Sequence, residues 1–394
     1  MKGPLDGLRV LDCTIALAGP FASLILADLG ADVIKIENPS PMSREASGLA
    51  AYKGENGHFL IANRNKRGLA IDLKSPEGRE VFYKLVKTSD ILVQNFRPGV
   101  MDRLGCGWEA LHEINPRLIY CSISGFGQGS PYSDLAGFDL IAQGMSGLMS
   151  VTGMPDGGEP VKVGTPVCDM GTGMYGVIGI LSALWHRAST GRGQHVEATL
   201  LDTPISWLTW RAAEYWGTGE IPEPQGSGRA VYRAFRCSDD RWVNIGPSNK
   251  LWPKACETIG LPELIEDERF ATPAQRLANH REVTALYQEA FLKRPSNEWI
   301  EAFQKAGVPV GPILTVADVL DDDPHVKARD MVVEVDHPVI GKMKTLGVPV
   351  KLSETPGSVK TAAPLLGQHT REILLELEYS EEQIESLSAS NVIC

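Results

Sequence analysis

The chain has 394 residues, of which 43% are hydrophobic and 22% charged, a balance typical of folded globular proteins. That length predicts two or three domains at roughly 150 residues per domain. The 38 Lys and Arg residues against 49 Asp and Glu residues give a formal net charge of −11. An acidic chain is a poor match for nucleic acid or for an anionic membrane surface, so any anionic ligand requires a local group of basic residues.

Seven cysteines are scattered along the chain without a Cys-x-x-Cys pair, a pattern typical of reduced thiols in a cytoplasmic protein. The first residues show no long apolar run of the kind found in signal peptides. The apolar run at residues 177–185 is too short to cross a bilayer. We therefore expect a soluble, cytoplasmic protein that has neither a membrane nor a nucleic acid as its partner.

Strand and helix signals alternate over the first 125 residues. The expected strands are residues 8–12, 31–37, 68–73, 90–96 and 117–123. One helix is expected over residues 21–29, ended by Gly30, and another from Ser75, which caps it, to about Lys87. The alternation, with strands that are apolar along their length, predicts an α/β fold with a parallel, Rossmann-like sheet covered on both faces. Ligands of such sheets bind beyond the carboxyl ends of the strands.

Two Gly- and Pro-rich stretches, residues 217–228 and 307–312, mark joints between domains. About a hundred residues lie between them, including an expected strand at residues 242–245, which is enough for a small α+β domain. The expected division is a large discontinuous domain made of residues 1–216 and 313–394, and a linker and small domain made of residues 217–312.

Residues 171–176 have the form Gly-x-Gly-x-x-Gly, and Glu197 follows about twenty residues later, as in dinucleotide-binding proteins. That motif requires an apolar strand directly before its first glycine, whereas residues 164–170 contain Gly and Pro. We therefore interpret Gly173, Gly176 and Gly179 as points of close helix packing rather than as part of a nicotinamide site.

Asp169 stands just before these glycines, at the expected N-terminus of an apolar helix. The helix dipole and the free N–H groups of the first turn are expected to hold its carboxylate ionised. Two interpretations stay open from the residues alone. Asp169 is either the N-cap of the helix or an exposed nucleophile that attacks an acyl group.

Positive charge gathers between residues 61 and 105, where nine basic and five acidic residues give a net charge of +4. The densest part is residues 63–67, whereas Lys74, Arg97 and Arg103 follow the third and fourth expected strands. Arginine forks bind phosphate groups, so these positions suit an anionic nucleotide. The eight histidines show no zinc-ligand spacing, and we expect no metal site.

With these residues in view, the chain resembles the family III CoA-transferases, which share their fold with the α-methylacyl-CoA racemases. The resemblance runs from residue 5 to about residue 388. The segments that carry it are residues 7–12, 18–20, 26–37, 63–67, 95–105, 190–194 and 363–370.

The resemblance implies that Asp169 is the family's nucleophilic aspartate, which carries CoA as a thioester. The residues that fall on the family's CoA-binding positions are Ala16, Leu17, Leu73, Lys74, Asn95, Phe96, Arg97 and Arg103, with Phe138 and Asp139 flanking the acyl thioester. Leu17 stands where oxalate-using members carry Gln, which argues against oxalate. Asn38 stands where some members place an Arg near the adenine.

The racemases carry a His in an Ala-Gly-His-Asp block, and that block reads Ala-Gly-Phe-Asp at residues 136–139 here. Phe138 cannot transfer a proton, so the transferase is favoured over a 2-methylacyl-CoA racemase or epimerase. The resemblance further implies coenzyme A as a substrate, no metal or redox cofactor, an acyl-CoA and a small carboxylic acid as partners, and a homodimer of two interlocked rings. A non-catalytic CoA-binding protein and a nicotinamide oxidoreductase remain as alternatives.

Overall fold

The computed structural model describes residues 2–40, 51–153, 158–224 and 229–394. The chain divides into two compact units. The first consists of Met1–Met149, Lys162–Ala212 and His325–Cys394, and the second of Ser150–Val161 and Ala213–Pro324. Residues 225–228, at the end of the first expected joint, lie outside the described residues.

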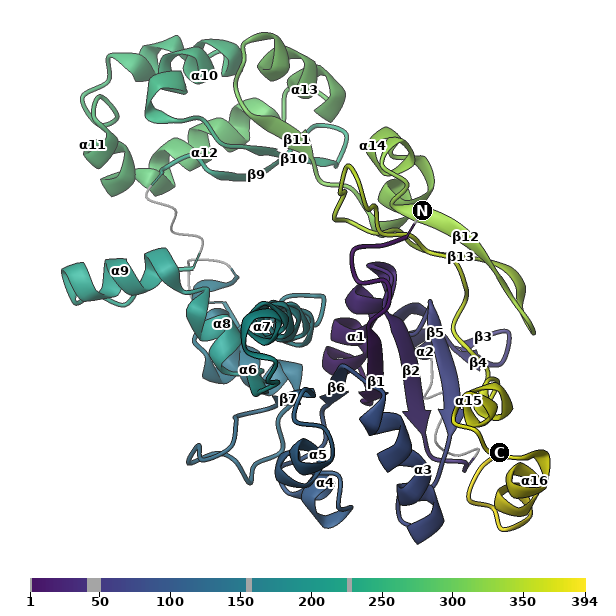
Figure 1. The fold of residues 1–394 in the computed structure, drawn as a ribbon. Helices are drawn as coiled ribbons and strands as arrows, with labels where there is room; N and C mark the ends of the chain where they lie inside the picture. Colours follow the sequence, from purple (N-terminus) through teal and green to yellow (C-terminus); the bar gives the residue numbers. More distant parts are fainter. Residues whose placement is uncertain (1, 41–50, 154–157, 225–228) are drawn as a thin grey trace. The chain divides into compact units, whose positions relative to one another are not determined.

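The first unit is built on a six-stranded sheet in which all neighbouring strands are parallel, in the order β5-β2-β1-β6-β7-β8. Figure 1 labels the first five of these strands. Its strands are β1 Arg9–Cys13, β2 Asp32–Glu37, β5 Lys66–Ala70, β6 Ile91–Gln94, β7 Ile119–Ser124 and β8 His195–Thr199. The parallel sheet predicted from the sequence is confirmed, and β8 is a strand that the sequence analysis missed. The chain builds outward from β1 in one direction and then returns to add β6 on its other side. The carboxyl ends of β1 and β6 therefore form the switch point at which such sheets bind ligands.

Helices cover both faces of this sheet. On one face lie α1 Ala18–Asp28, α6 Asp139–Met145 and α7 Val167–Thr190, and on the other α3 Pro76–Lys87, α5 Trp108–Ile114, α15 Thr370–Glu376 and α16 Glu381–Ala389. In β1, Val10 packs into the hydrophobic core on the side of α1, α6 and α7. Leu11 and Cys13 pack into the core on the side of α3, α5, α15 and α16. Both faces of the strand are buried, which is why the strand is apolar throughout. The predicted cap of α3 is also confirmed, since Ser75 accepts a hydrogen bond from Gly78 N.

Shorter elements complete the first unit. They are β3 Ala51–Tyr52, β4 Glu55–Asn56, α2 Gly57–Ala62, α4 Val100–Arg103, α8 Asp202–Ser206, and the hairpin of β12 Val332–His337 and β13 Gly341–Leu346. Elements that cross the division between the units are η3 Leu148–Val151, α9 Thr209–Thr218 and α14 Pro324–Ala328.

The second unit has an antiparallel sheet in the order β11-β10-β9 and several helices. Its elements are β9 Arg233–Arg236, β10 Trp242–Ile245, η4 Asn249–Leu251, α10 Trp252–Ile259, η5 Pro262–Ile265, α11 Pro273–Ala278, α12 His280–Phe291, α13 Ser296–Lys305, β11 Val310–Pro312 and η6 Asp318–Asp322. Its core is aromatic, with Phe291 stacked on Phe235 at 4.8 Å between ring centroids and on Phe303 at 5.8 Å. The strand expected at residues 242–245 is confirmed as β10.

Helix α7 has 24 residues, and by length and composition alone it is long and apolar enough to cross a membrane. The length argument based on residues 177–185 was therefore wrong, because the helix extends well beyond that run. One face of α7 packs closely within the unit: a Cβ at Gly173 would lie 2.8 Å from Ala18 O of α1, and one at Gly179 would lie 2.5 Å from Val196 of β8. Close packing through these glycines is confirmed, and residues 171–176 lie inside the helix rather than at a strand-to-helix turn.

Candidate active site

A pocket of about 390 Å³ lies at the carboxyl ends of β1, β6 and β7. Loops after these three strands, Ser133, residues 135–138 and the start of α7 line it. The lining residues are Ile15, Ala16, Ala18, Asn95, Phe96, Arg97, Pro98, Val100, Ile123, Ser124, Gly125, Phe126, Ser133, Leu135, Ala136, Gly137, Phe138, Asp169 and Leu200. Of the predicted site residues, the structure therefore gathers Ala16, Asn95, Phe96, Arg97, Phe138 and Asp169 in one pocket. Leu17, Leu73, Lys74, Arg103 and Asp139 do not line it.

The loop after β1 is clamped by a side chain of the loop after β6. Asn95 Oδ1 accepts a hydrogen bond from Ile15 N at 2.8 Å, and Asn95 Nδ2 donates one to Ile15 O at 2.7 Å. Ala16 follows with a φ of +60°, in the left-handed region that Ala rarely adopts. The clamp therefore holds a strained backbone at the wall of the pocket.

Beneath this loop lies a buried cluster around Asp12. Lys66 Nζ lies 2.8 Å from Asp12 Oδ2, and Lys35 Nζ lies 3.2 Å from Asp12 Oδ1. Ser23 Oγ donates to the same carboxylate at 2.6 Å, and Thr14 Oγ1 donates to it as well. Burial raises the pKa of Asp12, but the charges of the two lysines and these hydrogen bonds outweigh it and hold the pKa well below its usual range. The cluster is a fixed support for the loop above it, because Lys35 also donates to Thr14 O.

Asp169 lies in the first turn of α7, is partly buried and lines the pocket. The N-cap of the helix is Pro166, so the N-cap interpretation of Asp169 is wrong. Among the described residues, none donates a hydrogen bond to the Asp169 carboxylate. Burial, and then the negative charge of Asp139, raise the pKa of Asp169 to about 6. Burial and the charge of Asp139 thus outweigh the stabilisation expected from the helix N-terminus, although a group with this pKa is still mostly ionised at neutral pH.

Asp139 occupies the first position of α6, and its carboxylate is already engaged. Asp139 Oδ1 accepts hydrogen bonds from the backbone N of Cys168 at 2.8 Å and of Asp169 at 3.3 Å. Its neighbour Phe138, by contrast, lines the pocket with 68% of its surface exposed. Of the two residues expected to flank the acyl group, the structure thus places Phe138 at the pocket and Asp139 behind it.

Three basic side chains near this edge of the sheet are exposed and form no ion pair with any described residue. They are Lys74 beyond β5, Arg97 beyond β6, and Arg103 at the end of α4. The basic residues of the 63–67 segment behave differently. Arg64 pairs with Asp28 at 2.6 Å, and Arg67 pairs with Asp32 at 2.7 Å. The densest basic run of the sequence is therefore neutralised within the protein and offers no free charge to a ligand.

The loop after β7 is a part of the pocket that the sequence analysis missed. Ser124, Gly125 and Phe126 line the pocket. Gly125 meets Gly137 backbone to backbone, since a Cβ on Gly125 would lie 2.8 Å from Gly137 Cα. The glycines at 125 and 127, directly after an apolar strand, were the signal that could have found this loop.

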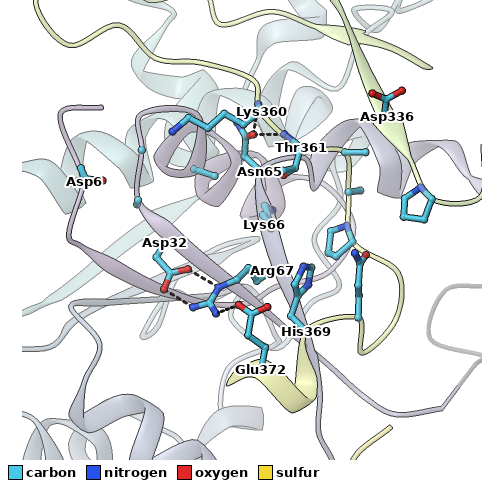
Figure 2. A pocket seen from close by; sticks show the side chains of 18 of the residues that line it. Asp6, Asp32, Asn65, Lys66, Arg67, Asp336, Lys360, Thr361, His369 and Glu372 are labelled. Atoms are coloured by element: carbon cyan, nitrogen blue, oxygen red, sulfur yellow. Dashed lines mark hydrogen bonds and ion pairs between the residues drawn. The ribbon is translucent and has the colours of Figure 1, made fainter. Parts of the chain in front are cut away.

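A larger pocket, of about 610 Å³, lies at the opposite edge, where β2 and β5 begin (Figure 2). Several of its polar groups are already engaged within the protein: Arg67 pairs with Asp32 and with Glu372, and Asn65 Oδ1 accepts from the backbone N of Lys360 and Thr361. A parallel sheet rarely binds its substrate at this amino edge. We therefore regard the 390 Å³ pocket as the active-site candidate.

The described residues contain no group of three His, Cys, Asp or Glu side chains close enough to hold a metal ion. The seven cysteines, all in the described part of the chain, form no disulfide. Burial raises the pKa of the Cys168 thiol, next to Asp169, to about 12, so this neighbour is not a thiolate nucleophile.

Comparison with known proteins decides the family. Residues 5–370 match CoA-transferase family III. The chain belongs to this family. It is 38% identical over 402 residues to a mouse succinyl-CoA:glutarate CoA-transferase, covering 99% of this chain and 90% of that protein. It is 37% identical to a formyl-CoA:oxalate CoA-transferase of Streptomyces coelicolor, covering 99% of both chains.

The family fold is also present in solved structures. A crystal structure of a CAIB/BAIF family protein from Brucella suis matches with a TM-score of 0.84 and 38% identity, covering 96% of this chain and all of that one. This family III member is therefore an enzyme, a CoA-transferase, and CoA is part of its substrate.

Proposed function

We propose that the enzyme moves CoA from an acyl-CoA donor to a free carboxylic acid by way of an aspartyl-CoA thioester on Asp169. The observation that carries the proposal is the state of this carboxylate. It lies at a pocket at the switch point of the sheet, it accepts no hydrogen bond from a described side chain or backbone group, and its pKa is raised to about 6. A carboxylate that is ionised yet poorly stabilised is a strong nucleophile for its class.

The reaction balances without an external acid, base or oxidant. The Asp169 carboxylate attacks the donor thioester carbonyl and expels CoA thiolate, which leaves an anhydride between Asp169 and the donor acyl group. The thiolate attacks the Asp169 carbonyl of that anhydride and releases the donor acid as its carboxylate. The acceptor carboxylate then attacks the aspartyl-CoA thioester and expels CoA thiolate, which leaves an anhydride between Asp169 and the acceptor. The thiolate attacks the acceptor carbonyl of this anhydride, which releases the new acyl-CoA and the free Asp169 carboxylate.

Each step passes through an oxyanion that needs hydrogen-bond donors. The backbone N–H groups of residues 171–173, although near Asp169, lie within α7 beyond its first three residues and are used by the helix itself. Ala16 is a better candidate, because it lines the pocket and its backbone N donates to no described residue. The clamp between Asn95 and Ile15 fixes the orientation of this N–H group.

The phosphate groups of CoA are assigned to the exposed basic side chains at this edge of the sheet. Arg97 lines the pocket directly. Lys74 and Arg103 lie outside its lining and suit the more distant 3′-phosphate and diphosphate groups of an extended cofactor. Ala16, Asn95 and Phe96 then form the wall along which the pantetheine arm runs.

For the acids that are exchanged we propose a small dicarboxylate other than oxalate. Relatives are named for succinate, glutarate and oxalate. The pocket wall includes Ile15, Leu135 and Phe138, whose apolar surfaces suit the methylene groups between two carboxylates. Phe138 also has no group for proton transfer, so nothing at this position favours a racemase. A panel of succinate, glutarate, malate and oxalate against one acyl-CoA donor tests this choice.

A homodimer is part of the proposal. On α7, a stripe of exposed apolar side chains runs along the helix at Met174, Ile178, Leu181 and Trp185. The spacing of four, three and four residues places these on one face, opposite the face that packs in the unit. A second copy of the chain is the proposed cover for this stripe, and sedimentation at micromolar concentration measures it. A cytoplasmic location stays a prediction, and the fully reduced cysteines agree with it.

Trapping the intermediate tests the mechanism. The enzyme is incubated with succinyl-CoA and then with hydroxylamine or borohydride, and modified peptides are mapped by mass spectrometry. We expect a hydroxamate or a reduced side chain at Asp169 and nowhere else, and a loss of transfer in Asp169→Ala of about 10⁴-fold or more. Asp134→Ala, a change in an exposed carboxylate near the pocket, is the matched control and keeps wild-type rates. An unmodified Asp169, or rapid transfer by Asp169→Ala, excludes the aspartyl-CoA route.

A further inference from the structure

The helix that carries Asp169 has no cap of its own. Its N-cap residue is Pro166, which has no side-chain donor or acceptor for the first turn. Met170 N donates to Pro166 O and Val167 N to Thr165 O, so Cys168 and Asp169 supply the N–H groups left over at this end. Both donate to Asp139 Oδ1, at 2.8 and 3.3 Å. The cap of α7 is thus supplied by a side chain about thirty residues earlier, on the neighbouring helix α6 (Figure 1).

The capping carboxylate is itself held in place. Gln143, one turn further along α6 and fully buried, donates from Nε2 to Asp139 Oδ2 at 2.6 Å. Gln143 Oε1 accepts from the backbone N of Val163 at 2.8 Å, in the segment that leads into α7. Asp139 and Gln143 therefore hold, by hydrogen bonds, both the segment that leads into α7 and the first turn of that helix. A 1 Å displacement of a reacting group can lower a rate about a hundredfold, so this fastening bears directly on the chemistry.

Resting on the proposed role of Asp169 as nucleophile, we infer that Asp139 is its positioning residue: held by Gln143, the Asp139 carboxylate caps α7, fixes the backbone of Asp169 and places a second negative charge behind it.

The negative charge of Asp139 also affects the pKa of Asp169. Elements α1, α8, β7 and β8 also pack against α7. The titratable groups on these elements and on the first half of α7, apart from Asp169 itself, are Asp28, Asp202, Tyr120, Cys121, His195, Glu197, Cys168 and Tyr175. Of the described residues, Asp139 is the charged group that acts on Asp169, where it adds to the effect of burial and raises the pKa. Asp139 thus keeps the nucleophile from being overstabilised as an anion by the positive end of the helix.

Two substitutions separate the cap from the charge. Asp139→Asn keeps an oxygen for the N–H groups of Cys168 and Asp169 and removes the charge, but its amide NH2 group cannot accept the hydrogen bond from Gln143 Nε2. We expect its kcat at optimal pH to stay within about threefold of wild type, and the acidic limb of its kcat/KM profile to move to lower pH. Asp139→Ala removes both, and we expect kcat to fall about a hundredfold with a KM for acyl-CoA within threefold of wild type. Asp134→Asn makes the same change in net charge away from α7, and we expect its pH profile to match wild type.

The inference is overturned if Asp139→Asn keeps the wild-type pH profile, or if Asp139→Ala keeps a kcat within threefold of wild type. Should Asp139→Ala fail to fold, as judged by circular dichroism, the pH profile of Asp139→Asn decides alone. Trapping on wild-type enzyme distinguishes this failure from that of the proposed function. An adduct on Asp169 with unchanged Asp139 variants removes only the positioning role, whereas no adduct on Asp169 removes the mechanism on which it rests.

Discussion

Two aspartates near the carboxyl edge of the same sheet, Asp12 and Asp169, differ in burial, in the charge of their neighbours and in pKa. Asp12, at the end of β1, is fully buried between Lys35 and Lys66. Asp169, at the start of α7, has no cation beside it among the residues that the structure describes, and it lies next to another carboxylate, that of Asp139. The pKa of Asp12 is held well below its usual range, whereas that of Asp169 is raised to about 6.

This difference distinguishes a carboxylate with a shifted pKa that stabilises the fold from one that is available to react with a substrate. A buried charge that is paired and hydrogen-bonded on all sides is stabilised where it is and has no capacity left for a substrate. A partly buried charge without partners is destabilised, and it gains free energy by bonding to an electrophile. The basic residues divide in the same way: Arg64 and Lys66 form ion pairs inside the protein, whereas Lys74 and Arg97 pair with no acidic residue in the described part of the chain.

The largest expected contrast is in stability. Asp12→Asn leaves two buried lysines without their carboxylate, so we expect it to lower the free energy of unfolding by about 3–5 kcal/mol. Asp169→Asn removes a charge that no described group stabilises, so we expect no loss. Urea unfolding at pH 7, followed by circular dichroism, measures both. Equal stability of the two variants would show that the contrast between the aspartates is not energetic.

The second contrast is between two basic residues, and the expected difference is about tenfold in KM for acyl-CoA. Arg97→Ala removes a free guanidinium at the pocket, so we expect KM for acyl-CoA to rise about tenfold with kcat unchanged. The increase shrinks at high salt, because exposed charges are screened. Arg192→Ala, at an exposed position before the amino end of β8, is the matched control and leaves KM unchanged. An equal change in KM for the two variants would remove the assignment of Arg97 to CoA phosphate.

The sequence predicted those structural elements that depend on residues close to one another in the chain. Strands buried on both faces are apolar along their length, so β1 and its neighbours were predictable. The cap at Ser75 was predictable because donor and acceptor lie three residues apart. The pocket position of Arg97 followed from its place after a strand of a parallel sheet, whereas Asp169 was singled out by its place at the N-terminus of an apolar helix.

What the sequence could not show depends on partners far away in the chain. Arg67 belongs to a basic run, yet its partners Asp32 and Glu376 lie 35 residues before it and 309 residues after it. Asp139 resembles a binding residue by position, yet the N–H groups that engage it lie 29 and 30 residues later. Neutralisation and capping at such separations follow from the folded arrangement rather than from any spacing in the sequence.

The smallest expected effect links the raised pKa of Asp169 to the stability of the enzyme. The unfolded chain releases this proton near pH 4, whereas the folded protein holds it to about pH 6. Between these values the folded state binds more protons, so the contribution of Asp169 to stability falls as the pH rises from 4 to 6 and stays low above that. Screening by solvent at this partly exposed site reduces the effect to about 1 kcal/mol. We therefore expect Asp169→Asn to match wild type at pH 4 and to exceed it by about 1 kcal/mol at pH 7, as measured by urea unfolding at the two pH values. A difference of the opposite sign at pH 7 would mean that the carboxylate is stabilised in the fold as Asp12 is, and the two aspartates would then no longer differ in kind.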